Sequence, residues 1–560
     1  MKIQIKSNFK KIALCVVLAQ FLLLLSYAQS KEFKFTHQDS LRGSIGAGRL
    51  KWNVLHYDIT VQPDYVNKTI TGKNSITILD SGINVMQIDL QYPMILDSVI
   101  SNEKPLSFQR EENVYWVTLN NIETKTIHKK IINFYFHGKP REAVNPPWDG
   151  GWIWKKDKNN NPWISVACQG LGASVWYPCK DTQEDEPDDG ATLNIIIPDT
   201  LNAIGNGRMK EQKKLDNHLI KYTWVVKSPI NNYNIVPYIG KYSHFSETYQ
   251  GLNGPLDMDY WVLDYNIDKA KNQFKDAKKM MKAFEYWFGP YPFYSDGYKL
   301  VEAPHLGMEH QSAVAYGNKY TKGYLGRDLS NTGWGLKWDF IIVHESGHEW
   351  FANNITAKDI ADMWIQEGFT NYSETLFTEY FYGKKAGSEY IIGLRDRISN
   401  DKNIIGPYGV NKEGSSDMYD KAGNMIHTIR QIINNDSIFR SILIGLNKRY
   451  YHQTVTTGEI ENYISKKSGI DLTAVFDQYL RTTMIPTLEY YYSADHFYYR
   501  WSNCVTDFKM PVRCSFNNKK ESWIYPSTEW KDLKLKESKL NNKFNVNLNF
   551  YIDTKEVIKQ

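Results

Sequence analysis

Residues 340–351 read FIIVHESGHEWF, and this stretch decides the fold because it places a metal-binding pattern inside an apolar run. His344 and His348 are four positions apart, so on a helix both imidazoles lie on one face and can bind the same ion. Glu345 is turned about 100° from His344, where it can accept a proton from a water molecule that the metal activates. We therefore predict a metal-binding helix over residues 338–354, with Glu345 as the general base.

A third metal ligand is expected from the next predicted helix, over residues 362–382. Glu367 follows His348 by nineteen residues, and a loop over residues 356–361 would return the chain antiparallel and bring Glu367 beside both histidines. Two imidazoles and one carboxylate leave one coordination position open, which is typical of catalytic zinc. The sequence thus predicts one zinc ion per chain, bound by His344, His348 and Glu367. The alternative, an amphipathic helix with surface histidines, is disfavoured because the flanks are apolar and buried polar groups need partners.

Hydrophobic periodicity divides the rest of the chain into three parts. A period of two from about residue 48 predicts an antiparallel β domain over residues 29–245, with an exposed loop at 146–162. A helical period predicts a mostly helical domain over 246–485, and alternation returns in a small β domain over 486–560. The fold class is therefore multidomain α+β. Besides the two helices above, we predict helices at 268–288, 384–399, 418–434, 437–450, 458–467 and 472–482, the one near Glu459 opened by a capping box with Thr456.

Residues 1–28 have the features of a signal peptide. Four lysines and no acid precede an apolar run over residues 12–25, which is too short for a spanning helix, and Ser26-Tyr27-Ala28 fits a cleavage site before Gln29. We expect an exported protein, periplasmic or secreted, with an uncleaved anchor as the alternative. No other run is long and apolar enough to span a bilayer, so we expect no stable membrane insertion after cleavage.

Charge and cysteine content limit the remaining classes. The net charge of +5 falls to 5 − 4 = +1 without the four lysines of residues 1–28, so there is no electrostatic case for nucleic acid. Export permits disulfides. Cys504 and Cys514 flank a turn at Met510-Pro511 and are candidates for a hairpin disulfide, with free buried thiols as the alternative.

Four segments together resemble the M1 family of zinc aminopeptidases. These gluzincins include aminopeptidase N and leukotriene A4 hydrolase, and the match runs over about residues 50–485. The H-E-x-x-H pattern is followed by Glu367 at the family spacing, and the stretch over residues 306–310 resembles the family segment G-x-M-E-N, with Leu306 and His310 as departures. The other two segments are residues 288–293, which read FGPYPF, and 419–423, which read YDKAG.

The resemblance implies a thermolysin-like catalytic domain and assigns further site residues. It implies that Glu309 and Gln169 bind the α-ammonium of a peptide with a free N-terminus, as a carboxylate can by charge-assisted hydrogen bonds. Gly307 and Met308 would line the substrate. Tyr419 would donate to the oxyanion of the tetrahedral intermediate, with Tyr408 as the alternative donor.

The predicted function is that of a zinc metalloaminopeptidase acting on peptides. The rival hypotheses are a zinc endopeptidase or epoxide hydrolase on the same fold, and a non-catalytic peptide-binding protein.

Overall fold

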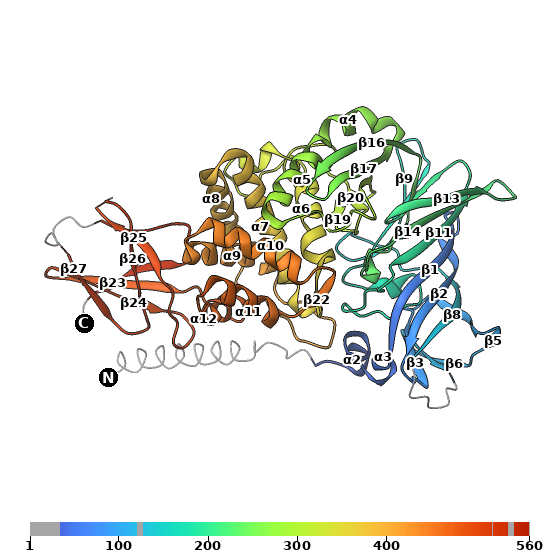
Figure 1. Cartoon of the computed structure of the whole chain (residues 1–560), viewed down its shortest axis with the longest axis horizontal. Coiled ribbons are helices and arrows are strands. Elements are labelled where there is room, and N and C mark those ends of the chain that lie inside the picture. Colours follow the sequence, from blue (N-terminus) through green and yellow to red (C-terminus); the bar gives the residue numbers. More distant parts are fainter. Residues whose placement is uncertain (1–33, 120–126, 518, 536–542, 559–560) are drawn as a thin grey trace, which may run out of the picture.

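The computed structural model describes residues 34–119, 127–517, 519–535 and 543–558 of the 560-residue chain. Figure 1 shows a β-rich N-terminal domain, a mostly helical middle domain and a small C-terminal β domain in a row. This confirms the predicted multidomain α+β fold. The predicted signal peptide lies outside the described residues. Within the described ranges, no helix combines the length and hydropathy that crossing a membrane requires.

The N-terminal domain is built on an eight-stranded sheet with the order β13-β14-β11-β1-β2-β8-β4-β5. Buried and exposed side chains alternate along much of β1 (Trp52–Asp64), as the period-two pattern predicts. All neighbouring strands are antiparallel except β1 and β11, which pair in parallel. The other strands are β2 (Thr69–Asp80), β4 (Ile95–Ser101), β5 (Lys104–Pro105), β8 (His128–Gly138), β11 (Ala191–Pro198), β13 (Arg208–Lys214) and β14 (Leu219–Val226).

The prediction of an exposed loop over residues 146–162 was wrong in part. Residues Gly151–Lys156 form β9, which pairs with β10 (Pro162–Ala167). Trp152 is fully buried and packs edge-on against Trp176. Burying an indole ring of this segment stabilises the fold more than exposing its glycines and lysines to solvent does. The two smaller sheets are β12-β15-β10-β9 and β3-β7-β6, with β3 (Val85–Asp89), β6 (Phe108–Glu111), β7 (Val114–Thr118), β12 (Asn202–Ile204) and β15 (Tyr238–Gly240). The helices α2 (His37–Gly43) and α3 (Ala47–Leu50) precede β1.

The middle domain begins with a five-stranded sheet in the order β16-β17-β18-β20-β19. Its strands are β16 (Tyr242–Gly251), β17 (Gly254–Leu263), β18 (Tyr298–Glu302), β19 (Gly307–Met308) and β20 (Val314–Tyr316). The domain boundary expected at residue 245 lies inside β16, which pairs with β17 along its whole length. The short strand β19 forms the edge of this sheet, next to β20.

The helical layer follows the predicted periodicity closely. Residues 268–288 form two helices divided at Phe274 rather than one, and Gly289 ends the second with a φ of 93°. The capping box of Thr456 and Glu459 is confirmed. The helices are α4 (Ile267–Gln273), α5 (Lys275–Phe288), α6 (Phe340–Gly347), α7 (Trp364–Tyr382), α8 (Lys384–Gly393), α9 (Asp420–Ile433), α10 (Asp436–Arg449), α11 (Thr457–Ser468) and α12 (Thr473–Leu480), and β21 (Ile355–Ala357) pairs with β22 (Gln453–Val455).

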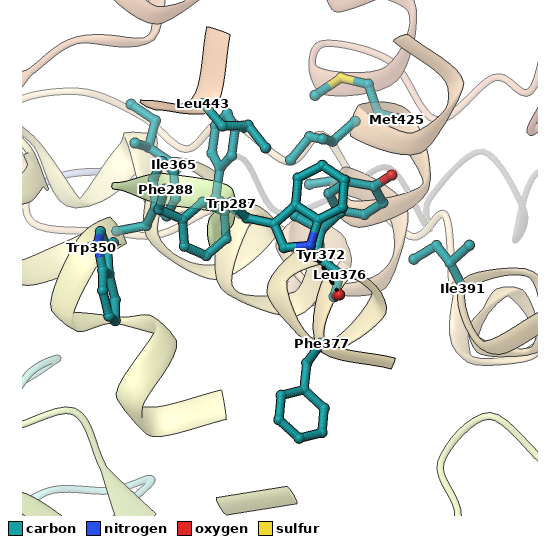
Figure 2. Packing of buried hydrophobic residues seen from close by; sticks show 14 of the residues in the cluster. Trp287, Phe288, Trp350, Ile365, Tyr372, Leu376, Phe377, Ile391, Met425 and Leu443 are labelled. Atoms are coloured by element: carbon teal, nitrogen blue, oxygen red, sulfur yellow. Dashed lines mark hydrogen bonds between the residues drawn. The ribbon is translucent and has the colours of Figure 1, made fainter. Parts of the chain in front are cut away.

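The long helix α7 forms the centre of this layer, and all its residues from Trp364 to Thr378 are buried. The indole Nε1 of Trp287 donates to the Leu376 carbonyl at 3.2 Å. A helix that is enclosed on all sides cannot shift without disturbing several neighbours at once. Figure 2 shows apolar side chains around it, among them Trp287 and Phe288 of α5, Ile391 of α8, Met425 of α9 and Leu443 of α10.

The C-terminal domain contains a four-stranded sheet, β27-β24-β23-β29, and a three-stranded sheet, β26-β25-β28. Gln478 of α12 joins it to the helical layer, because its amide donates to the Met484 carbonyl and accepts from the Val505 amide. Cys504 and Cys514 are both free thiols, so no disulfide joins them. The strands are β23 (Thr487–Ser493), β24 (His496–Ser502), β25 (Val512–Phe516), β26 (Ser522–Ile524), β27 (Lys531–Lys534), β28 (Phe544–Val546) and β29 (Asp553–Glu556).

The described residues form two large hydrophobic cores, and they meet near β19. One core joins the helical layer to the C-terminal β domain and includes Ile341 of α6. The other fills the N-terminal domain but also takes in Met308 and Ala315 from the five-stranded sheet of the middle domain. Residues 307–309 therefore lie at the junction of two separately packed bodies.

Candidate active site

The three predicted metal ligands converge. Nε2 of His348 lies 3.4 Å from Oε2 of Glu367, and Nε2 of His344 lies 3.8 Å from the same oxygen. One ligand atom from each residue lies within 4.8 Å of the other two, and all three residues are buried. The structure thus brings together ligands from α6 and α7 as the sequence predicts.

Both histidines are held with Nε2 free to bind a metal. Nδ1 of His344 bonds to Oε1 of Glu374 at 2.7 Å, and Nδ1 of His348 bonds to the Phe351 carbonyl at 3.0 Å. A carbonyl or an ionised carboxylate can only accept, so each Nδ1 carries a hydrogen and Nε2 is the ring nitrogen left to bind a metal. Oε2 of Glu367 is buried and has no hydrogen-bond partner among the described residues. This donor set fits zinc, because an unpartnered buried carboxylate oxygen faces the Nε2 atoms of two imidazoles.

Glu345 occupies the expected position of the general base. Burial, with the carboxylates of Glu309 and Glu367 acting in the same direction, raises its pKa to about 7. A Cβ placed on Gly307 would lie 2.6 Å from Oε1 of Glu345. Only glycine therefore lets strand β19 come this close to the base.

Glu309 lies in the same cluster. Carboxylate oxygens of Glu309 and Glu345 and a ring nitrogen of His348 lie within 4.8 Å of one another. The hydroxyl of Tyr233, from the N-terminal domain, donates to Oε1 of Glu309 at 3.0 Å. Burial raises the pKa of Glu309, whereas the bond from Tyr233 favours its charged form. Sequence reasoning missed Tyr233, since nothing in the local pattern distinguishes it from the other tyrosines.

The predicted partner Gln169 makes no hydrogen bond to Glu309 within the described residues. It is half-buried in the turn after β10, and its Nε2 has no hydrogen-bond partner among the described residues. The preceding residue, Cys168, contacts the Tyr233 carbonyl through Sγ at 3.5 Å. Met308 is 7% exposed and packs in the N-terminal core. His310 is fully buried, with Nδ1 2.5 Å from the Tyr238 hydroxyl.

Tyr419 immediately precedes α9, and its ring lies 6.2 Å from the ring of His344. Burial and the carboxylate of Glu367 raise its pKa well above the ordinary value, so the hydroxyl stays protonated and can donate. The alternative donor, Tyr408, is committed elsewhere, because its hydroxyl donates to Oδ1 of Asp362 at 2.7 Å. Of the two tyrosines, Tyr419 is the one placed beside a metal ligand.

The metal-binding helix does not continue to residue 354 as predicted. α6 ends at Gly347, and the irregular turn η5 (Glu349–Asn353) follows, in which Ala352 adopts φ 149° and ψ −52°. This conformation is unfavourable for any residue with a Cβ. It turns the Phe351 carbonyl toward His348, and it places Asn353 where its amide donates to the Glu309 carbonyl at 2.9 Å. The distortion thus links a metal ligand to the predicted amine-binding residue.

Two family models match the chain. Residues 53–233 match the Peptidase M1 N-terminal domain, and residues 272–479 match the Peptidase family M1 domain. The chain belongs to peptidase family M1. The first match includes Tyr233, and the second includes Glu309, Glu345 and the three predicted zinc ligands, so both sides of the site lie within family-matched regions.

Curated M1 relatives are distant and longer than this chain. Leukotriene A-4 hydrolase of Xenopus laevis is 20% identical over 447 residues, covering 74% of this chain and 68% of its own length. Aminopeptidase N of Lactococcus lactis is 21% identical over 457 residues, covering 77% and 51%. The chain spans about half to two thirds of the length of such relatives.

Solved M1 structures share the fold. A mutant of the M1 zinc metallopeptidase from Deinococcus radiodurans, bound to a Tyr-Ser-Ala substrate, superposes with a TM-score of 0.66 at 17% identity, covering 78% of this chain and 96% of that one. A two-domain M1 zinc metallopeptidase mutant bound to L-arginine gives 0.61 at 18% identity, covering 75% and 92%.

Proposed function

We propose that this chain is a zinc aminopeptidase that removes the first residue from peptides with a free N-terminus. The observation that carries the proposal is the position of Glu309, whose carboxylate lies within 4.8 Å of Glu345 and His348. A buried carboxylate so close to the reacting centre suits the α-ammonium of a first residue and leaves little room for a residue before it.

Each residue of the site has a distinct role. His344, His348 and Glu367 would hold a zinc ion, which would supply Lewis-acid polarisation of the scissile carbonyl and activation of a water molecule. Glu345 accepts a proton from the attacking water and returns it to the leaving amine, a task for which a pKa near neutrality is suited. Tyr419 donates a hydrogen bond to the developing oxyanion. Glu309 binds the ammonium group and so sets the distance from the N-terminus to the scissile bond.

The rival hypotheses differ in the substrates they allow. An endopeptidase cleaves peptides whose N-terminus is blocked, whereas an epoxide hydrolase needs no amine at all. A non-catalytic binding protein would have lost a ligand or the base, and this chain retains both.

The deciding experiment compares free and N-acetylated aminoacyl-coumarin substrates, with and without a chelator. We expect hydrolysis of the free substrates only, loss of activity with chelator and recovery on adding zinc. Glu345→Gln should retain zinc but lose about 10²- to 10⁴-fold in turnover, because an amide cannot accept the proton. Equal hydrolysis of the acetylated substrates would overturn the proposal in favour of an endopeptidase.

We also propose that the protein is exported, on the strength of residues 1–28 alone. Expression in a bacterium with a periplasm, followed by N-terminal sequencing, should give a mature chain that starts at Gln29. A cytoplasmic protein that retains Met1 would contradict this proposal.

A further inference from the structure

The turn over residues 231–234 of the N-terminal domain contacts Glu309 in two ways. Tyr233 donates to the side-chain Oε1 of Glu309 at 3.0 Å. Asn234 donates to Oδ1 of Asn353 at 2.8 Å, and Asn353 in turn donates to the backbone carbonyl of Glu309 at 2.9 Å. One short turn therefore bonds directly to the carboxylate and, through a single intermediary, to the backbone of the same residue.

The turn itself is held rigidly. Asn231 donates to the Gln183 carbonyl at 2.7 Å, and Asn232 donates to the Lys180 carbonyl at 2.9 Å. The hydroxyl of Tyr177 donates to the Asn232 carbonyl at 2.9 Å. All residues from Asn231 to Asn234 are at most 2% exposed. A buried turn with its backbone and side chains bonded in this way has one arrangement available to it.

Tyr233 is the one side chain that donates to the Glu309 carboxylate within the described residues. A carboxylate on a flexible side chain rotates freely unless one oxygen is fixed, and binding a substrate then costs the entropy of that rotation. With Oε1 bonded to Tyr233, the other oxygen is left for an incoming ammonium group.

We propose that Tyr233 is a positioning residue for terminal-amine recognition, which it controls by fixing Glu309 through a hydrogen bond from the other domain. The inference rests on the proposed role of Glu309 as the amine anchor. It assigns part of the exopeptidase selectivity to the N-terminal domain, through a residue whose hydroxyl donates to Glu309 and, within the described residues, to neither the predicted metal ligands nor the predicted base. The second contact, which runs through Asn234 and Asn353, fixes the backbone of Glu309, while Tyr233 fixes its side chain.

The test measures how much the free amine contributes to binding. Leucine hydroxamate and its des-amino analogue both bind a catalytic zinc. The ratio of the inhibition constant of the des-amino analogue to that of leucine hydroxamate therefore reports the contribution of the amine alone. Tyr233→Phe should reduce this ratio about 10-fold or more, the usual effect of losing a hydrogen bond to a charged group. The matched control is Tyr177→Phe, which removes a buried hydroxyl bonded to the same turn but not to Glu309. It should reduce the ratio much less than Tyr233→Phe does, because the turn keeps the bonds of Asn231 and Asn232.

A double variant separates positioning from general destabilisation. In a Glu309→Gln background, Tyr233→Phe should have no further effect on the ratio, because its effect is transmitted through the carboxylate. A wild-type ratio in Tyr233→Phe, an equal loss in Tyr177→Phe, or an additive loss in the double variant would each overturn the inference.

The failure of this inference can be told apart from failure of the proposed function. If Glu309→Gln leaves the ratio unchanged, Glu309 is not the amine anchor and the proposed function fails with it. If Glu309→Gln reduces the ratio to about one while Tyr233→Phe leaves it at the wild-type value, only the role of Tyr233 is wrong. Should Tyr233→Phe fail to fold, Asn353→Ala tests the second contact with Glu309 instead. A reduced ratio supports the inference, and an unchanged ratio overturns it.

Discussion

Nδ1 of His344 bonds to the carboxylate of Glu374 at 2.7 Å, and Glu374 lies seven residues beyond Glu367 on the same helix. Its other oxygen accepts from the Tyr390 hydroxyl at 2.5 Å, so both oxygens are occupied. Helix α7 thus supplies both a predicted metal ligand, Glu367, and the carboxylate that orients the predicted ligand His344 of α6.

Glu374→Gln should weaken zinc binding about 10- to 100-fold, because a neutral amide orients the imidazole less strongly and makes it less basic. Competition with a chromogenic chelator measures the change. Tyr372→Phe is the matched control, since it removes a buried hydroxyl from the same helix that bonds to His427 instead. Unchanged zinc affinity in Glu374→Gln would show that His344 is oriented by other contacts.

Tyr419→Phe should lower kcat about 10²- to 10³-fold with little change in KM, because its hydrogen bond strengthens only as charge develops on the oxyanion. Steady-state kinetics on a free aminoacyl substrate checks this. Tyr408→Phe should leave kcat near the wild-type value, because its hydroxyl bonds to Asp362. The opposite result for the two variants would make Tyr408 the donor.

Ala352→Gly should stabilise the middle domain by about 1 kcal/mol. Glycine adopts φ 149° without the steric cost that alanine carries, and this gain exceeds the added entropy of the unfolded chain. Ala357→Gly, in the regular strand β21, should instead destabilise. Urea unfolding followed by tryptophan fluorescence compares the two midpoints. A lower midpoint for Ala352→Gly would mean that the surrounding packing, not the backbone, dominates at this position.

His427 and His305 should each contribute stability that is lost as the pH is lowered below about 6.5. Burial lowers the pKa of His427 to about 3 and that of His305 to about 4. In this window the unfolded chain takes up protons that the folded chain excludes, so each histidine removes about 1.4 kcal/mol of stability per pH unit. This loss continues down to the folded pKa values near 3–4.

Unfolding at a series of pH values tests this dependence. His427→Gln should reduce the slope between pH 6 and 4 by about one proton. His218→Gln, whose side chain is 94% exposed, should leave it unchanged. An unaltered slope in His427→Gln would mean that this histidine takes up its proton without unfolding.

The sequence predicts those parts of the site that depend on spacing within one element. Helix periodicity places His344, Glu345 and His348, and the following helix places Glu367. Glu374 was not predicted, although its separation of two turns from Glu367 puts both on one face of α7 and is a signal that could have been used. Glu309 and Tyr419 came from resemblance to a family rather than from periodicity.

Other features have no local signal. The contact between Tyr233 and Glu309 joins residues 76 positions apart in different domains, and only tertiary packing determines it. The distortion at Ala352 lies within residues 348–354, which contain neither proline nor glycine, so the local sequence gives no signal for it. The buried strand β9 was missed because its composition is typical of a loop, while its indole rings are in fact core residues.

Because two cores meet at β19, destabilising mutations in one core are expected to have different effects from those in the other. The metal ligands are supported by the core of the helical layer, whereas Met308 belongs to the core of the N-terminal domain. We expect mutations that loosen the second core to leave metal content intact and, if Glu309 binds the substrate amine as proposed, to reduce the selectivity for the first residue. Among variants of this protein, zinc content and selectivity for the first residue are therefore expected to change independently.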